Sequence, residues 1–157
     1  MEHRPIGIIH SPFTDPAGMP IQPSGASDVK GTVEVFVEYK CGLQDLDGFS
    51  HIILLYQFHR SRGFALCVVP FLDTVLRGIF ATRSPRRPNH IGLSVVRLER
   101  LDGRVLHIAG VDILDGTPLL DIKPYVPEFD SPSDVRTGWF GSSGNRVRET
   151  RSDGRFA

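Results

Sequence analysis

Hydrophobic residues in this chain recur in short alternating stretches and not in long helical stripes. Residues 31–39 alternate, with one side formed by Val33, Val35, Val37 and Tyr39, which predicts a half-buried strand. Residues 51–58, HIILLYQF, are a continuous apolar run of strand length and predict a central strand buried on both faces. No sustained 3.6-residue period is present. The pattern therefore favours a mainly β fold.

Turn signals divide the rest of the chain into further short elements. Residues 91–100 and 105–111 predict an antiparallel hairpin around Asp102-Gly103, a dipeptide typical of tight turns. A turn at 115–118 precedes a strand at 119–126, residues 65–72 and 78–82 are additional strand candidates, and residues 41–48 predict a short helix or turn.

The 16 glycines and 12 prolines break the chain into short pieces. We therefore expect a mainly β fold, namely a small antiparallel β-barrel with few short helices, and a β-sandwich is the alternative. We expect residues 1–130 to form the barrel domain. Residues 131–157, rich in Ser, Gly, Arg and Asp, should form a polar tail that is partly mobile or draped on a partner.

Composition constrains the partners. The 157 residues suit one domain. Because 18 cationic residues balance 18 anionic ones, the net charge gives no evidence for a nucleic-acid partner, and such a partner would need a local basic patch. Cys41 and Cys67 have neither metal-ligand nor redox spacing. Because the first residues lack a signal-peptide core and no apolar run reaches about 20 residues, we expect a cytoplasmic protein with no membrane partner.

The richest local patch is an arginine turn. Residues 74–98 contain no Asp or Glu, yet they include Arg83, Arg86 and Arg87 with two prolines, Pro85 and Pro88. Proline restricts its own φ and the preceding residue, and positioned guanidinium groups bind phosphate or carboxylate well. The pattern predicts an anion-binding turn that leads into a strand. The alternative is a solvated basic loop.

A second polar segment, VDILDGTPLLDIKPY, covers residues 111–125. Uninterrupted alternation would place Asp121, Lys123 and Tyr125 on one face of a strand, with Asp112 and Asp115 before the turn. A plain Asp121–Lys123 ion pair and a turn-capping Asp115 are the simpler alternatives. Since HExxH, paired CxxC, EF-hand, GxSxG, Walker and GxGxxG motifs are all missing, we expect no metal and no Rossmann-type cofactor site.

Four segments together resemble one family: IGIIHSPF at 6–13, residues 33–58, GIFATRSPRRPNHIGLSVV at 78–96 and DILDGTPLLDIKPYVPEFD at 112–130. They are similar to the TrmO family, also described as YaeB-like. The resemblance implies a dimeric β-barrel that uses S-adenosyl-L-methionine to methylate tRNA. The implied target is the N6 atom of N6-threonylcarbamoyl-adenosine, beside the anticodon, so tRNA (anticodon loop) is the expected partner.

The resemblance also implies a site. Its cofactor-binding residues would be Pro23, Ser24, Gly25, Ser61, Arg62, Arg87, Asp115, Gly116, Thr117 and Pro118. For substrate contacts we expect Arg83, Arg86, Asn89 and Lys123. The acceptor nitrogen must lose a proton, and the candidate catalytic bases are Asp112, Asp121 and Tyr125.

This sequence departs from the family at His90, where a second proline is common, so we expect a less rigid turn. The extra C-terminal domain of longer bacterial members is also not expected here. Two other functions therefore stay open: methylation of another small or RNA acceptor, and a non-catalytic module that binds the cofactor or a nucleotide.

Overall fold

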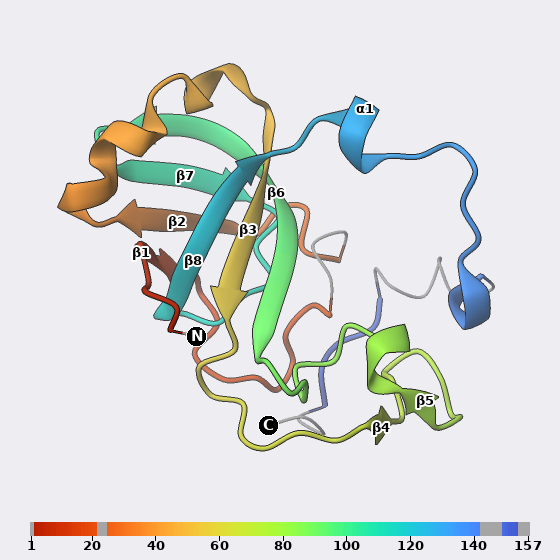
Figure 1. Ribbon diagram of the computed structural model, residues 1–157. Coiled ribbons are helices and arrows are strands. Elements are labelled where there is room, and N and C mark those ends of the chain that lie inside the picture. Colours follow the sequence, from red (N-terminus) through yellow and green to blue (C-terminus); the bar gives the residue numbers. More distant parts are fainter. Residues whose placement is uncertain (1, 22–24, 142–148, 154–157) are drawn as a thin grey trace.

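Six antiparallel strands close into a barrel (Figure 1). The computed structural model describes residues 2–21, 25–141 and 149–153. Around the barrel the order is β1 (Gly7–His10), β2 (Lys30–Val35), β7 (Val105–Ala109), β6 (Ile91–Asp102), β3 (His51–Gln57) and β8 (Thr117–Pro124), and β8 pairs with β1. The predicted barrel is confirmed. Closure removes the free sheet edges that open β structures expose.

The barrel interior is filled by alternate residues of the strands. In β3 the residues Ile52, Leu54 and Tyr56 point inward and are at most 4% exposed, while Ile53 and Leu55 on the outer face are half-buried. β3 lies between β6 and β8, but the prediction that both of its faces are buried is wrong, because one face of a barrel strand looks outward. The predicted hairpin is also present, because β6 pairs with β7 across a turn in which Gly103 has φ 62°.

The alternation over residues 31–39 predicts a longer strand than is formed. β2 ends at Val35, where it pairs with the first residue of β1, Gly7. Beyond that point the backbone has no neighbouring strand to bond, and it turns into the 3₁₀ helices η2 (Val37–Leu43) and η3 (Leu46–Gly48). Val37 is consequently 73% exposed. The short helical segment expected at 41–48 is therefore found, but it begins earlier.

A small excursion stands beside the barrel between β3 and β6. It contains a two-stranded sheet of β4 (Cys67–Val68) and β5 (Arg77–Gly78), followed by the 3₁₀ helix η4 (Ile79–Ala81). The strands expected at 65–72 and 78–82 are thus mostly irregular. After the barrel come the one-turn helix α1 (Pro127–Asp130) and the 3₁₀ helix η5 (Gly138–Phe140). Across the described residues, no helix has the length and apolar character needed to cross a bilayer.

Candidate functional site

A large cavity lies at the end of the barrel where β3 finishes and β8 begins. Its volume is about 1040 Å³, at the upper end of the roughly 300–1,000 Å³ typical of small-molecule sites. Its wall includes residues of the loop after β3 and of the excursion that carries β4 and β5, which are drawn in the lower half of Figure 1. Four stretches far apart in sequence form most of its wall: 56–61, 70–72, 80–85 and 113–117. We call this cavity the end pocket.

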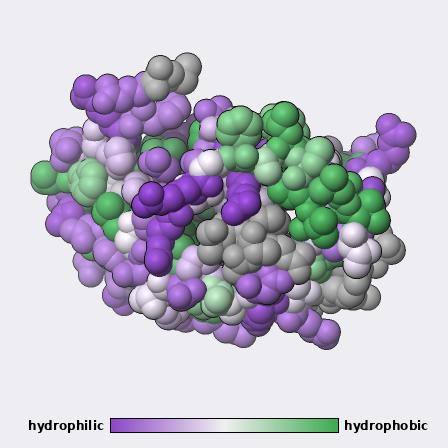
Figure 2. Space-filling view, turned by 90° about the horizontal axis from the view of Figure 1, so that it is seen from below, coloured by the Kyte–Doolittle hydropathy of each residue, from purple (hydrophilic) through white to green (hydrophobic). Residues whose placement is uncertain are grey.

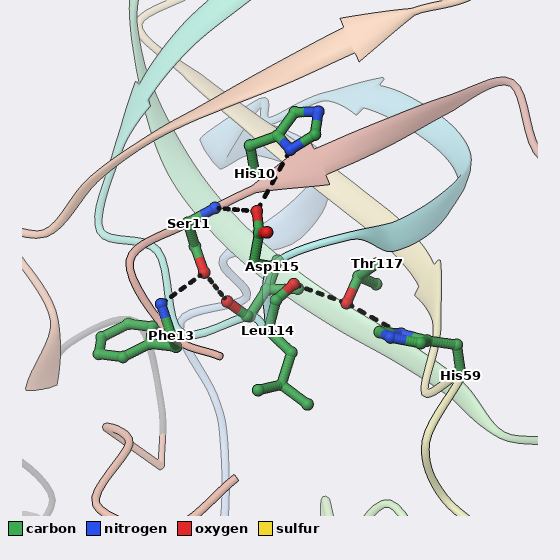
Figure 3. A network of polar contacts seen from close by, with 8 residues as sticks. His10, Ser11, Phe13, His59, Leu114, Asp115 and Thr117 are labelled. Carbon is green, nitrogen blue, oxygen red and sulfur yellow. Dashed lines mark hydrogen bonds and ion pairs between the residues drawn. The ribbon is translucent and has the colours of Figure 1, made fainter. Parts of the chain in front are cut away.

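The turn at 115–118 is tied to the end of β1, as Figure 3 shows. The carboxylate Oδ1 of Asp115 accepts from Ser11 N and contacts His10 Nδ1, each at 3.2 Å. The backbone amides of Asp115 and Gly116 donate to the carbonyls of Phe13 and Ile9. These amides are therefore already used and do not face a ligand. Asp115 fastens the turn, as its capping alternative proposed.

Thr117 brings a hydroxyl from this turn to the wall of the end pocket. Its Oγ1 donates to Leu114 O at 2.8 Å and lies 3.3 Å from His59 Nδ1. Burial, and then the charge of Arg60, lower the pKa of His59, which keeps its imidazole neutral near pH 7. No sequence motif includes His59. The available signal was its position directly after the central strand, since loops at strand ends carry sites.

The arginine turn forms another part of the wall, but its arginines differ in their roles. Arg83 lines the end pocket. Arg87 instead donates through Nη1 to the carbonyls of Ile79 (3.2 Å) and Thr82 (2.8 Å), and its guanidinium lies 5.8 Å from the Phe80 ring centroid. Arg87 therefore holds the η4 turn together and is not itself on the pocket wall.

The turn is also braced from the loop that follows β3. Ser61 Oγ donates to Pro85 O at 3.3 Å, and Ala65 N donates to Arg86 O at 3.2 Å. His90 Nε2 donates to Gly63 O at 2.7 Å, so the histidine adds an anchor where the sequence suggested a looser turn. Within the described residues, Arg86 Nε is buried without a hydrogen-bond partner.

A chain of three polar side chains lies at the pocket end of the barrel interior. Tyr56 OH is 3.1 Å from Ser94 Oγ, which donates to Asp112 Oδ1 at 2.7 Å. Tyr56 is on the wall of the end pocket. Burial raises the pKa of Asp112 to about 6, against the opposing effects of Ser94 and Arg83. Of the three candidate bases, Asp112 alone belongs to this end of the barrel.

Asp121, Lys123 and Tyr125 lie toward the opposite end. Lys123 Nζ and Asp121 Oδ2 form an ion pair of 2.9 Å, and the Tyr125 ring is 6.4 Å from the His51 ring. Along a strand, the six steps from Thr117 to Lys123 span roughly 20 Å. Asp121 lines a separate hollow of about 560 Å³. The structure does not bring these residues together with Asp112.

A register shift within β8 changes which of its side chains face inward. Tyr56 pairs with Leu119, but its neighbour Leu55 pairs with Asp121, so the strand contains a β-bulge that adds one residue. Leu119 points into the core before the bulge, and Ile122 packs against the core after it. The inward positions therefore change from odd to even, and Leu119 and Asp121 do not share a face.

The remaining predicted residues take various positions. Pro23 and Ser24 lie outside the described residues, and Gly25 directly follows them. Arg62 and Asn89 are exposed, and Pro118 pairs with Ile8 in the barrel.

The segment expected to be a tail contributes to the end pocket. Thr137, Trp139, Phe140 and Ser152 line the cavity. Trp139 Nε1 donates to Ala81 O at 2.8 Å, and the Arg77 guanidinium lies 5.6 Å from the Trp139 ring centroid. Backbone bonds between Ser152 and both Gly18 and Met19 fix the last described residues to the N-terminal loop. Aromatic side chains were thus supplied by a segment whose composition is polar.

Fold and pocket together define a ligand-binding antiparallel β-barrel whose site is built from loops at one barrel end. The chain belongs to the family described as the tRNA-methyltransferase O N-terminal domain, TrmO_N, whose sequence pattern matches residues 8–131.

Individual relatives agree with this assignment. The chain is 57% identical to a probable S-adenosyl-L-methionine-binding protein of Pyrococcus abyssi, over 98% of this chain and 84% of the relative. It is 39% identical to the tRNA (adenine(37)-N6)-methyltransferase of Homo sapiens, over 83% of this chain and 31% of the relative.

A crystal structure of TrmO from Pseudomonas aeruginosa superposes with a TM-score of 0.75 at 40% identity, covering 88% of this chain and 62% of that one. The chain therefore spans less than two thirds of the human and Pseudomonas proteins.

Proposed function

We propose that this protein is an S-adenosyl-L-methionine-dependent methyltransferase that methylates the N6 atom of an adenosine in tRNA. The observation that carries the proposal is the family match over residues 8–131, which includes the barrel and most of the end-pocket wall. The relative named as a tRNA (adenine(37)-N6)-methyltransferase supports the reaction. We further propose N6-threonylcarbamoyl-adenosine, beside the anticodon, as the modified base on which it acts.

The end pocket has the chemistry to hold S-adenosyl-L-methionine, which supplies a methyl group on a positively charged sulfur. Its polar groups include Ser61, Thr117 and Arg83, and its aromatic rings include Phe71, Phe80 and Trp139. Arginine suits the carboxylate of the cofactor, while aromatic faces suit a planar base and a cation. His59 is neutral, so it does not repel the sulfonium. In place of Arg87, we assign the carboxylate to Arg60 or Arg83, which lie on the wall.

The arginine turn supports an RNA substrate despite the zero net charge. Arg83, Arg86 and Arg87 lie within one turn next to the end pocket, and Phe80 is 75% exposed above Arg87. Single-stranded bases stack on aromatic rings and arginine planes, and phosphates bind guanidinium groups. A local site of this kind fits an anticodon loop, which presents unstacked bases.

We also propose that the protein acts as a homodimer in the cytoplasm. Exposed large hydrophobic side chains gather on the β4–β5 excursion: Phe64, Leu66, Val75, Leu76 and Phe80. Figure 2 shows hydrophobic surface concentrated at the right of the view, on the side where this excursion lies in Figure 1. An exposed apolar cluster of this kind is typical of an interaction surface, and a second copy would cover it.

The test is transfer of a labelled methyl group from S-adenosyl-L-methionine to tRNA, with transcripts that carry or lack the threonylcarbamoyl group. We expect incorporation only into the threonylcarbamoylated tRNA, and binding to tRNA that weakens as salt increases. Incorporation into both transcripts would support the adenosine methyltransferase and contradict the threonylcarbamoyl requirement. Cofactor binding without transfer to any RNA or small acceptor would instead favour a non-catalytic module.

A further inference from the structure

The three polar side chains at the pocket end of the barrel form a continuous hydrogen-bonded path. Ser94 is 1% exposed and Tyr56 4% exposed, and they come from the neighbouring strands β6 and β3. Asp112 lies in the segment that follows β7, and its carboxylate accepts a hydrogen bond from Ser94. Barrel interiors are otherwise filled by apolar groups, so a buried polar path needs a reason of its own.

The hydrogen bonds in this path have a fixed direction. An ionised carboxylate only accepts, so Ser94 Oγ donates its single proton to Asp112 Oδ1. Ser94 has no second proton to give, and Tyr56 OH therefore donates to Ser94 Oγ. The Tyr56 oxygen thus keeps a lone pair with which it can accept a further hydrogen bond, and Tyr56 lines the end pocket.

The Tyr56 ring is held in place by its neighbours. Gly92 pairs with Tyr56 across β3 and β6, and a Cβ at Gly92 would lie 2.3 Å from Tyr56 Cε2. The ring therefore occupies space that only glycine leaves open. Phe58 packs against it edge to face, with ring centroids 5.4 Å apart. The phenol oxygen is consequently positioned before any ligand binds.

We propose that Tyr56, Ser94 and Asp112 form a proton relay that removes the proton from the nitrogen being methylated; this inference rests on the proposed function. The nitrogen passes its proton to Tyr56 as Tyr56 passes one to Ser94 and Ser94 passes one to Asp112. The electron pair of the nitrogen forms the N–CH3 bond, and the S–CH3 bonding pair returns to sulfur. The products are the methylated amine, a neutral thioether and a protonated Asp112.

The surroundings of the relay suit this task. The groups that face Asp112 are Ser94 from β6, Tyr56 from β3 and Arg83 from the arginine turn. A carboxylate whose pKa is about 6 holds a proton more readily than an ordinary aspartate and is still ionised at pH 7. Burial and the Asp112 charge raise the pKa of Tyr56 far above neutrality. Tyr56 therefore transmits a proton without remaining ionised.

The test uses the full chain with three variants, Asp112→Asn, Ser94→Ala and Tyr56→Phe, and two matched controls, Ser50→Ala and Tyr39→Phe. Ser50 and Tyr39 do not line the end pocket. Single-turnover methyl transfer and calorimetric cofactor affinity are measured for every protein. A carbon-13 NMR pH titration of the Asp112 carboxyl in the free protein is measured for those that keep Asp112.

We expect Asp112→Asn to lower the rate constant roughly 100-fold, within the range for general-base catalysis, with cofactor affinity unchanged. It should also remove the rise in rate that wild type shows as pH increases through about 6. Ser94→Ala and Tyr56→Phe should lower the rate, and the controls should match wild type. In the free protein, Asp112 should titrate near pH 6, and higher in Ser94→Ala, because the Ser94 hydrogen bond favours the carboxylate.

Wild-type rates in the Ser94 and Tyr56 variants, or an unchanged pH profile in Asp112→Asn, would overturn the relay and leave the proposed function standing. An Asp112 that titrates near pH 4 in the free protein would overturn it too, whatever the activity. If wild type binds cofactor but methylates no tRNA, the proposed function fails, and the relay fails with it.

Discussion

Replacing Asp112 with asparagine should make the protein more stable at neutral pH. Asparagine keeps an oxygen that accepts from Ser94 Oγ but removes the charge that burial disfavours. In wild type, burial raises the pKa of Asp112 from its ordinary 3.8 to about 6. The folded state thus binds the proton more tightly than the unfolded state does.

The size and the pH range of the effect follow from these two values. Below about pH 4 the residue is protonated in both states, and its charge costs nothing. From about pH 4 to 6 the unfolded chain has released the proton and the folded chain has not, so each increase in pH lowers the free energy of unfolding. Above about pH 6 the full cost is present. About two pH units, at about 1.4 kcal/mol each, set an upper limit of about 3 kcal/mol.

Urea denaturation of both proteins at pH 4, 5, 6, 7 and 8 measures this cost. The other carboxylates titrate in both proteins, so they cancel in the difference. We expect the variant to gain nothing at pH 4 and up to about 3 kcal/mol at pH 8. Parallel stability curves over this range, or a wild type that is more stable at pH 8, would refute the argument that Asp112 is held in an unfavourable charged state.

Three further substitutions test the architecture of the end pocket. Gly92→Ala should lower the free energy of unfolding in urea by about 1–3 kcal/mol, because its Cβ would lie 2.3 Å from the Tyr56 ring. The control Gly48→Ala meets no atom within 4 Å and should not clash. Equal losses of unfolding free energy in the two variants would contradict this. Arg87→Ala should weaken cofactor binding in calorimetry, because the turn whose carbonyls Arg87 holds is loosened. Arg87→Lys should not restore the affinity, since lysine lacks the planar guanidinium group. Wild-type affinity in either variant would show that the turn keeps its shape. Trp139→Ala should weaken cofactor binding with little change in urea stability, and unchanged affinity would remove the C-terminal segment from the site.

The barrel was predictable because its strands carry local signals. The apolar run at 51–58 marks β3, and the Asp102-Gly103 turn marks the hairpin of β6 and β7, whose pairing is forced by the short loop between those two strands. The end of β2 at Val35 was not predictable from its alternation, which continues to Tyr39. Where a strand ends depends on where its neighbours end, and Gly7, its partner, is 28 positions away (35 − 7).

The candidate site was predictable in its turns and not in its contacts. The arginine turn and the turn at 115–118 do lie at one barrel end, with Arg83 and Thr117 on the pocket wall. Asp121 and Tyr125 were proposed as bases beside Asp112 because they are near it in sequence, but β8 carries them toward the opposite end of the barrel. Ser94 carried no motif, because a serine in an alternating strand resembles any other polar position until its neighbours across the sheet are known.

The stability cost at Asp112 bears on function. The core beside the path is apolar, with Leu54, Val96 and Ile113 at most 2% exposed, while Asp112 itself is half-buried. An apolar residue of similar size at position 112 would avoid the cost of a partly buried charge. Asp112 is therefore not needed to close the barrel. The relay proposed above gives its carboxylate a use, since the carboxylate accepts from Ser94, Ser94 contacts Tyr56, and Tyr56 lines the end pocket. Unfavourable charge placement of this kind is concentrated at sites that do chemistry, and it is a further reason to propose the end pocket as the reacting one.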